Sequence, residues 1–565
     1  MVKILVIQTS RFGDLLQTTP MLHTLRRRYS KADITVLSRY NVLEVYRDNP
    51  DVDHVELFNI EEYTERLMAA PSDIFSYYAE LRDSVKHLKA KGFDMVINIT
   101  HDRFSSFLTY LISPPEIRGM FLSPDTKLRL QVNGFWFQYL RCASDFRTIA
   151  SFNLVDIYKN IIGGDCETED LYFNVPPASK LKAEELLPAS SQRTFIGFQL
   201  GTSTNNRRWP ARYFAQLGDM IQKEDGKQVV FLGTKNEKWL GDEVTGLMKK
   251  RPINLIGETN ITELAGVLSR CSLLVTNDTG TMHLAEAVGT KCIALFFESA
   301  NPYQTGPYGA GHIICSPDLD CFPCSTIEEC EDKKCLDMIP SESVFNLVKY
   351  QLGLKSSGDG SIGHGTRIHE TLISRFGIWD AWPLNPILLQ KQDLIRKIYR
   401  NMWIRYSFSN HTLDNIRIER SPDEILSEEL NEWIQCYHFD GASYNQWLKD
   451  FKTNLNKLKG LSTKGLSIIR GIASLNSRGL LNGSTAVEKS NKLGKIDQKI
   501  KSFGESNLWL SQLVNLFNLE LEQISDSNFF IMLNKWKQTY NDFKLRIELL
   551  LQEIESIKGV LDKNE

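Results

Sequence analysis

The segment from Cys271 to Gly289 places the strongest constraint on the fold, because it passes from an apolar run through a polar loop into a helical pattern. Cys271–Val275 predicts a buried strand and Met282–Val288 predicts a helix. The loop between them therefore lies where a strand ends and a helix begins. Unpaired backbone N–H groups and the positive end of the helix dipole favour a phosphate there. The segment predicts a nucleotide-diphosphate pocket at the edge of an α/β sheet.

The length and charge of the chain narrow the class of protein. With 565 residues it is too long for one ordinary domain, and about three domains are expected. The formal net charge of −3 argues against bulk electrostatic binding to nucleic acid. No run approaches the roughly 18 apolar residues of a membrane span, and Met1–Ile7 is too short for the apolar region of a signal peptide. We expect a cytoplasmic protein whose cysteines are thiols or metal ligands.

Two series of alternating strand and helix patterns indicate two Rossmann-like domains, over residues 1–180 and 190–354. Pro176-Pro177 and the charged stretch up to Leu187 read as the connection between them. Two such halves suggest an enzyme with its ligand in a cleft, although a periplasmic-type binding protein fits the same pattern. The predicted strands are Ile4–Ile7, Ile34–Leu37, His54–Leu57, Met95–Ile99, Phe195–Gln199, Gln228–Leu232 and Lys291–Phe297, and the predicted helices are Leu15–Tyr29, Tyr78–Ala90, Ala211–Lys223 and Lys238–Lys249.

The character of the chain changes after Leu354. Residues 355–366 have the composition of a flexible linker, and strand signals largely disappear over 367–565. We expect an all-α accessory domain there, which buries its own apolar seams or uses them for self-association or partner docking. One seam consists of Trp536, Tyr540, Phe543, Ile547, Leu550, Ile554 and Ile557, and a second of Tyr444, Trp447, Phe451, Leu455 and Leu458. The basic stretch from Lys489 to Lys501 is typical of a solvated helix face.

Asp14 is a candidate catalytic residue, because it lies where the strand Ile4–Ile7 ends and the helix Leu15–Tyr29 begins. A carboxylate at this edge can accept a proton from a hydroxyl nucleophile. The competing role is local, since aspartate commonly caps the free N–H groups of a helix start. The position alone leaves both roles open.

The stretch from Gly201 to Pro210 is a second candidate site, because hydroxyl-rich residues and two arginines follow the strand Phe195–Gln199. Short donors and fixed positive charge suit a phosphate. Adjacent arginines point in different directions, so we expect only one of Arg207 and Arg208 to face the ligand. Surface arginines beside a buried Trp209 are the alternative.

Glu237 follows a further strand that ends in Gly233-Thr234. Its carboxylate could bind the two hydroxyls of a ribose, and an exposed glutamate at a helix start would look the same.

Cys321, Cys324, Cys330 and Cys335 have the spacing C-x2-C-x5-C-x4-C. Four thiolates within such a short stretch can make a tetrahedral zinc or iron site. The alternative is a loop with free thiols. Because the cluster follows the candidate catalytic loops, we expect any metal to be structural.

Read together, five motifs resemble glycosyltransferase family 9, the ADP-heptose:lipopolysaccharide heptosyltransferases. The resemblance covers roughly residues 1–350. The motifs are Arg11-Phe12-Gly13-Asp14-Leu15 with Thr18-Thr19-Pro20, Arg207-Arg208-Trp209-Pro210, Gly233-Thr234-Lys235-Asn236-Glu237, Asn277-Asp278-Thr279-Gly280-Thr281-Met282-His283 and Thr305-Gly306-Pro307-Tyr308-Gly309.

The resemblance implies a GT-B fold, in which two Rossmann-like domains face a cleft, and an inverting transfer that needs no metal or other cofactor. It implies that Asp14 is the general base and that Arg207 takes the place of a phosphate-binding lysine. It also implies that Glu237 binds the ribose, and that Thr202 and Ser203 contact phosphate. Asp278, Thr279, Gly280 and His283 match the diphosphate and sugar loop. Some relatives that glycosylate proteins bind iron through cysteines near the position of this cluster.

The chain also departs from the family pattern. Phe296-Phe297-Glu298-Ser299 stands where the family usually has Phe-Gly-Pro-Thr, which puts a bulky Phe297 near the expected nucleotide. The long His54–Phe93 segment and the helical tail are additions to a minimal heptosyltransferase.

The expected partners follow from the resemblance: a nucleotide-sugar donor, with ADP-heptose favoured, and an acceptor that is lipopolysaccharide or a related surface glycan. A protein acceptor such as flagellin or an autotransporter adhesin is the first alternative. A non-catalytic GT-B scaffold and a GT-B-fold epimerase are the others. Arg11 and His101 are weaker candidates for acceptor contacts. Peripheral association with the inner face of the membrane stays open.

Overall fold

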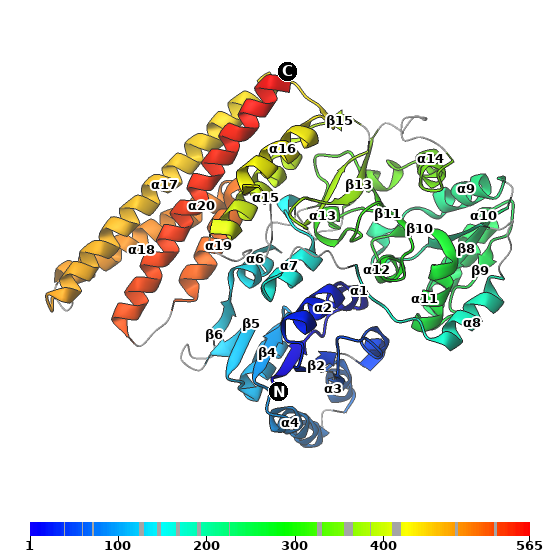
Figure 1. The fold of residues 1–565 in the computed structure, drawn as a ribbon, viewed down its shortest axis with the longest axis horizontal. Coiled ribbons are helices and arrows are strands. Elements are labelled where there is room, and N and C mark those ends of the chain that lie inside the picture. The colour runs from blue at the N-terminus through cyan, green and yellow to red at the C-terminus, as the bar shows by residue number, and fades with distance from the viewer. Residues whose placement is uncertain are drawn as a thin grey trace. The chain divides into compact units, whose positions relative to one another are not determined.

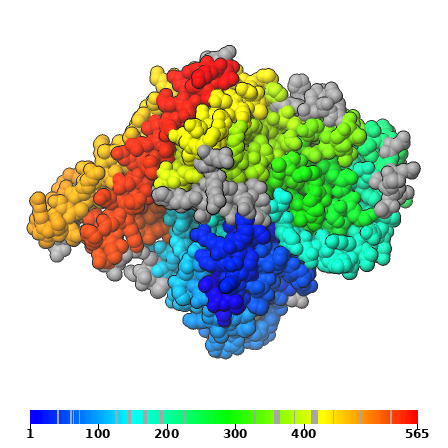
Figure 2. Space-filling view, in the orientation of Figure 1, coloured from blue at the N-terminus to red at the C-terminus, as the bar shows by residue number. Residues whose placement is uncertain are grey.

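The computed structural model describes residues 1–38, 40–58, 60–70, 73–123, 129–143, 148–164, 170–188, 194–224, 226–324, 330–354, 365–384, 386–409, 420–480, 484–524 and 528–564 (Figures 1 and 2). These residues form two compact units. The first contains Met1–Thr100, Leu111–Ile117 and Phe152–Ile387, and the second contains His101–Tyr110, Arg118–Ser151 and Leu388–Glu565. Within the described ranges, no helix has both the length and the apolar character needed to cross a bilayer.

The first unit begins with a parallel sheet whose strands run in the order β3-β2-β1-β4. Val6 of β1 pairs with Val36 of β2 and Ile97 of β4, and all three side chains are fully buried. Strand pairs buried on both faces explain the near-continuous apolar runs of the sequence. The elements are β1 (Lys3–Ile7), α1 (Phe12–Gln17), α2 (Thr19–Arg28), β2 (Asp33–Ser38), β3 (His54–Leu57), α3 (Ile60–Ala69), α4 (Ile74–Ala90), β4 (Met95–Asn98) and α7 (Leu154–Ile161).

An eight-stranded sheet with the order β14-β13-β12-β11-β10-β7-β8-β9 forms the rest of the first unit (Figure 1). Its strands are parallel from β12 to β9, while β13 and β14 pair antiparallel at the edge. The strands are β7 (Thr194–Gln199), β8 (Lys227–Leu232), β9 (Ile253–Asn254), β10 (Cys271–Asn277), β11 (Cys292–Leu295), β12 (Ile313–Pro317), β13 (Thr366–Ile373) and β14 (Trp379–Pro383). The helices are α8 (Pro177–Leu186), α9 (Ala211–Ile221), α10 (Lys238–Leu247), α11 (Ile261–Arg270), α12 (Gly280–Ala287), α13 (Pro302–Thr305) and α14 (Ser341–Gln351).

The second unit is largely helical. The helix α20 packs along α17. Of the seven residues of the first predicted seam, the six from Tyr540 to Ile557 are almost fully buried. The seam is therefore buried within the unit, as the first interpretation expected. The elements are α5 (Arg103–Ile112), β5 (Glu116–Ser123), β6 (Arg129–Asn133), α6 (Phe135–Ala143), β15 (Ile387–Leu388), α15 (Lys391–Ser409), α16 (Pro422–Ile434), β16 (Tyr437–His438), α17 (Gly441–Ser477), α18 (Ser484–Glu505), α19 (Ser511–Glu522) and α20 (Phe529–Asn564), with α5, β5 and β15 crossing the boundary between the units.

The α/β class with a helical C-terminal region is confirmed, but the predicted limits of the parts differ from the observed ones. The strands β13 and β14 extend the second sheet beyond residue 366, so the all-α region begins later than predicted. Residues 118–151 cluster with the helices rather than with residues 1–100, because Phe135 of α6 packs against Trp403 of α15, with ring centroids 5.4 Å apart. The connection predicted after Pro176 is the helix α8, whose Ser179 bonds Thr262 of α11. Most of the predicted linker lies outside the described residues.

Candidate functional site

The site is built where β7 and β10 end side by side, since Thr276 is paired with Gln199 in the parallel register. The buried side chain of Asn277 links the segments that leave these strands. Its Nδ2 donates to the carbonyl oxygens of Gln199 and Leu200 at 3.3 and 3.1 Å, and its Oδ1 accepts the backbone N–H of Trp209 at 2.9 Å. A buried amide with these partners fixes both loops at the carboxyl edge of the sheet.

The helix α12 begins at this edge, with Thr279 as its N-cap residue and Gly280 as its first residue. Its free N–H groups and dipole favour an anion, as the sequence predicts. Gly280 lies against the start of α1: a Cβ atom at Gly280 would lie 2.7 Å from the ring of Phe12, and one at Gly13 would lie 2.9 Å from the ring of His283. Only glycine at both positions allows this close approach.

Asp14 lies in the first turn of α1, in the part of the first unit that contacts α12. Its Oδ2 accepts the backbone N–H of Arg11 at 3.1 Å, so the capping role is present. The candidate anion loop, Asp278–Gly280, is called the Asp278 loop below. The negative charge of Asp14 also acts on this part of the site, because it contributes to raising the pKa of both Asp278 and His283. The structure therefore brings Asp14, Asp278 and His283 together. Because Asp14 also caps α1, its catalytic role is a proposal.

Arg207 ends a short 3-10 helix, Asn205–Arg207, and its guanidinium contacts three side chains. Nε donates to Glu298 Oε2 at 3.2 Å, Nη2 donates to Ser299 Oγ at 2.7 Å, and Nη1 lies 3.7 Å from Asp278 Oδ2. The planar fork of arginine suits this fixed arrangement better than lysine would. Arg207 is thus held beside the Asp278 loop.

Arg208 contacts Trp239 and Asn205 instead. Its guanidinium carbon lies 5.1 Å from the ring centroid of Trp239, and its Nη2 donates to the side chain of Asn205. Trp209 is fully buried, and its indole N–H donates to the carbonyl oxygen of Ile339 at 2.9 Å. The neighbouring arginines therefore have separate surroundings, and only Arg207 contacts the Asp278 loop.

Thr202, Ser203 and Glu237 lie on the loops after β7 and β8. Thr202 donates its hydroxyl to the carbonyl oxygen of Thr204, and Ser203 is exposed. Glu237 accepts the backbone N–H of Thr234 at 2.6 Å and its hydroxyl at 2.9 Å, which is a local capping arrangement. The Glu237 carboxylate also lies against Gly201, where a Cβ atom would overlap Glu237 Oε1. The carboxylate thus reaches the edge where β7 ends, as a ribose contact would require.

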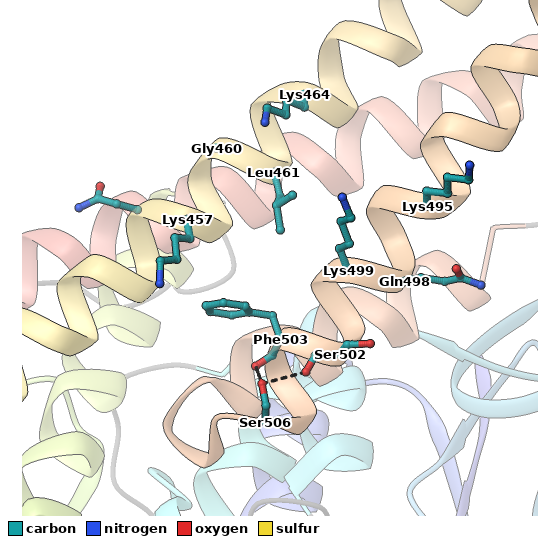
Figure 3. A pocket seen from close by; sticks show the side chains of 11 residues that line it. Lys457, Gly460, Leu461, Lys464, Lys495, Gln498, Lys499, Ser502, Phe503 and Ser506 are labelled. Carbon is teal, nitrogen blue, oxygen red and sulfur yellow. Dashed lines mark hydrogen bonds between the residues drawn. The ribbon is translucent and has the colours of Figure 1, made fainter.

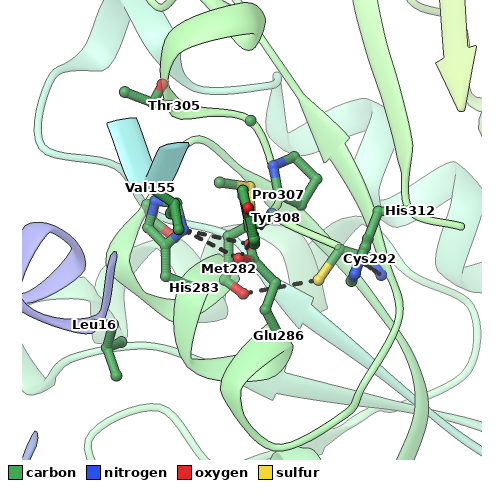
Figure 4. Close-up of polar contacts among 12 residues, drawn as sticks. Leu16, Val155, Met282, His283, Glu286, Cys292, Thr305, Pro307, Tyr308 and His312 are labelled. Carbon is green, nitrogen blue, oxygen red and sulfur yellow. Dashed lines mark hydrogen bonds and ion pairs between the residues drawn. The ribbon is translucent and has the colours of Figure 1, made fainter. Parts of the chain in front are cut away.

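His283 and Glu286 form a buried pair on α12 (Figure 4). His283 Nδ1 lies 3.4 Å from the Glu286 carboxylate, whose Oε2 accepts the backbone N–H of Tyr308 at 3.0 Å. Burial works against protonation of His283, but Glu286 and Asp278 outweigh it and raise the pKa of His283 above its ordinary value. Burial raises the pKa of Asp278, although His283 and Arg207 partly offset this effect. The site therefore favours a protonated His283.

Two carboxylates at the site, Glu286 and Glu298, were missed by the sequence analysis. Glu286 stands three residues after His283 on a predicted helix, a spacing that could have indicated the pair. Glu298 has a backbone φ of 56°, in the left-handed region, which no local pattern predicted. Phe297, which the sequence puts near the expected nucleotide, has its ring fully buried in the core of the second sheet.

The two weaker acceptor candidates belong to different units. Arg11 is exposed at the N-cap of α1 in the first unit, whereas His101 is exposed just before α5 in the second unit.

The four predicted metal ligands line one small cavity of about 100 Å³ beside Glu298. Burial, with the neighbouring thiols, raises the pKa of Cys324 to about 11, which favours the protonated thiol. Over the described ranges, no three His, Cys, Asp or Glu side chains form a group that could hold a metal ion. The predicted zinc or iron site is therefore unsupported, although residues 325–329, which join Cys324 to Cys330, lie outside the described residues.

These features define an α/β protein whose second sheet carries the candidate anion loop at its carboxyl edge. Residues 81–335 match the model of glycosyltransferase family 9 (heptosyltransferase). Over these residues, which are less than half of the chain, the protein is similar to the heptosyltransferases of that family, and a helical C-terminal region lies beyond them.

Two curated relatives and one solved structure illustrate the similarity. Lipooligosaccharide heptosyltransferase 2 of Haemophilus influenzae is 30% identical over 141 residues, which are 23% of this chain and 40% of that protein. The Campylobacter jejuni protein of the same name is 29% identical over 30% of this chain and 55% of that protein. The chain thus spans about half the length of these relatives. The crystal structure of the glycosyl transferase family 9 from Veillonella parvula has a TM-score of 0.52 at 24% identity. The match covers 63% of this chain and 98% of that chain, and it shows the shared fold.

Proposed function

We propose that the chain is an inverting glycosyltransferase that moves a sugar from a nucleotide-diphosphate donor to a hydroxyl group of lipopolysaccharide or a related surface glycan. ADP-heptose is the favoured donor, since both curated relatives described above are named heptosyltransferases. The observation that carries the proposal is the grouping of Asp14, Arg207 and His283 around the Asp278 loop. A scaffold protein would have no need of this grouping.

In the proposed reaction, Asp14 accepts the proton of the acceptor hydroxyl as its oxygen attacks the anomeric carbon. A new glycosidic C–O bond forms on one face while the bond to the donor phosphate breaks on the other, so the configuration inverts. The nucleoside diphosphate leaves with the bonding electron pair. Arg207, protonated His283 and the N–H groups at the start of α12 supply positive charge and hydrogen-bond donors for it. The proposal needs no cofactor.

The contacts of Arg207 indicate how the donor would engage it. Asp278 and Glu298 neutralise the guanidinium in this structure. A diphosphate would have to compete with these carboxylates, and it would offer stronger bidentate acceptors in return. Glu237, at the edge next to Gly201, is the proposed ribose contact, and Thr202, Ser203 and Thr279 are proposed contacts to the donor phosphates.

The test begins with nucleotide binding by the purified full chain. Thermal shift with ADP and other nucleoside diphosphates should show stabilisation by the nucleotide of the donor. Transfer is then assayed with ADP-heptose and other nucleotide sugars, and a deletion strain is examined by mass spectrometry of its glycans and proteins. A missing sugar on surface glycan supports the proposal. A missing sugar on a protein would favour the protein acceptor, and absence of any nucleotide binding would favour the scaffold.

A further inference from the structure

The face between α17 and α18 carries a groove of about 900 Å³ that lies within the second unit (Figure 3). Lys457 and Lys464 of α17 and Lys495 and Lys499 of α18 surround it. Leu461 and Phe503, both partly buried, supply apolar surface between the lysines. The groove therefore combines positive charge on two walls with an apolar strip.

The charges of the groove are not compensated by the protein. None of the described residues that line it is acidic, and across the described part of the chain no ion pair is formed by any of its four lysines. Nearby lysines behave differently: Lys459 pairs with Glu548 at 3.0 Å, and Lys492 pairs with Glu488 at 2.6 Å. Acidic partners are thus present on α18 and α20, but they do not line the groove.

Gly460 lines the groove and adds no side chain to it. It is exposed on α17, and a Cβ atom placed there would meet nothing within 4 Å. Glycine inside an exposed helix costs about 1 kcal/mol relative to alanine, so local helix stability does not explain its presence. The hydroxyl of Ser502, which also lines the groove, adds a donor suited to phosphate oxygens, whereas Ser506 Oγ donates to the carbonyl oxygen of Ser502 at 3.0 Å.

We propose that this groove binds the phosphorylated headgroup of an anionic lipid and so docks the helical unit on a membrane surface. Lysine ammonium groups complement the phosphate, and Leu461 and Phe503 contact the apolar part of the same molecule. A nucleic acid fits less well, because the overall charge of −3 gives no extended positive field and the lysines surround one short groove. The proposal does not depend on the transfer reaction, since it concerns binding alone.

The test measures co-sedimentation of the full chain with vesicles of phosphatidylcholine alone and with vesicles that also contain phosphatidylglycerol. We expect binding only to the anionic vesicles, and weaker binding at high salt. The double variant K464Q/K499Q should bind roughly 10- to 30-fold more weakly, since each lysine near an anionic surface contributes about a fivefold effect. The matched control, K537Q/K558Q, removes two exposed lysines of α20 that do not line the groove and should bind as the parent does.

A second pair of variants separates the groove from general loss of charge. Gly460→Glu places a carboxylate in the groove, while Gly559→Glu places one on α20 at another exposed glycine with open space around it. Both changes favour helix formation, so both proteins should fold. Equal vesicle binding by the two variants, or equal binding of the parent to both vesicle types, would overturn the proposal. Groove-dependent binding of glycerol phosphate or polyglutamate without vesicle binding would also overturn it, in favour of a soluble phosphate or an acidic peptide.

Discussion

The Asp278 loop and the α17/α18 groove both present positive charge, but their charges are held in different ways. At the loop, Arg207 is fixed by Glu298, Ser299 and Asp278, and His283 is paired with buried Glu286. At the groove, the lysines are exposed and have no carboxylate among the residues that line it. A fixed and compensated cation suits a ligand of one geometry, whereas flexible uncompensated ammonium groups suit any anion of the right charge density. The comparison predicts a selective site and a salt-sensitive surface.

The largest expected effect tests whether the Asp278 loop and Asp14 form a catalytic site. Asp14→Asn should lower transfer by about 10²- to 10⁴-fold, the usual contribution of a general base, with nucleotide binding nearly unchanged. The variant should fold, because asparagine can still accept the Arg11 N–H. The measurements are turnover and nucleotide affinity.

Glu263→Gln is the matched control for this variant. Glu263 also lies in the first turn of a helix and accepts a capping N–H, from Asn260 at 2.9 Å, but it is on α11. The Glu263→Gln substitution should leave turnover unchanged. Near-normal turnover in Asp14→Asn would remove Asp14 from the role of base.

The next largest effect tests whether Arg207 contributes more to turnover than its neighbour Arg208. Arg207→Ala should lower turnover by about 10²- to 10³-fold, since it removes a preorganised charge from the leaving diphosphate. Arg207→Lys should recover part of the activity, because the charge remains while the fork is lost. Arg208→Ala, which removes the arginine beside Trp239, should change turnover little. Equal losses in the two alanine variants would contradict the assignment.

A smaller effect is expected from Glu298, which positions Arg207. Glu298→Gly should lower turnover by roughly tenfold, consistent with loss of one charge-assisted hydrogen bond, while nucleoside diphosphate affinity stays equal or rises. Its backbone already has a positive φ, so glycine is tolerated there. Glu298→Gln keeps an acceptor for Arg207 Nε and should restore most of the turnover. Parallel losses of affinity and turnover would point to a structural role instead.

Local patterns in the sequence predicted most elements of the first unit. The strand at Ile4–Ile7 is observed as Lys3–Ile7, and the anion loop lies where the strand and helix pattern placed it. The predicted helix Leu15–Tyr29 is divided at Thr18, because Pro20 near the start of α2 lacks the N–H that would continue α1.

The rest depends on contacts between residues that are far apart in the chain. The membership of residues 118–151 in the second unit rests on aromatic packing such as that of Phe135 and Tyr406, with centroids 5.2 Å apart. Likewise, the hydrogen bond that holds Arg207 joins it to Glu298, 91 positions further along the chain. Periodicity reports which face of an element is apolar, but it does not report which distant element covers that face.

The smallest expected effect concerns the pH dependence that distinguishes the paired site from the groove. The raised pKa of His283 means that its positive charge is complete at low pH and is lost as pH rises through that pKa. Glu286, Asp278 and Asp14 face this histidine, and their negative charges favour its protonated form. Nucleoside diphosphate affinity should therefore fall by about fivefold, or about 1 kcal/mol, across this step. The same sign holds for the contribution of His283 to folding stability.

His283→Gln should abolish the step in nucleotide affinity, which calorimetry measures as pH rises beyond the ordinary pKa of histidine, and it should leave vesicle binding by the lysine groove unchanged. His283 does not line the groove, so anionic-vesicle binding by the parent chain should show no step there. A step that persists in His283→Gln would assign the titration to another group. A matching step in vesicle binding would show that the two cationic regions do not respond independently, because one titrating imidazole would then govern both.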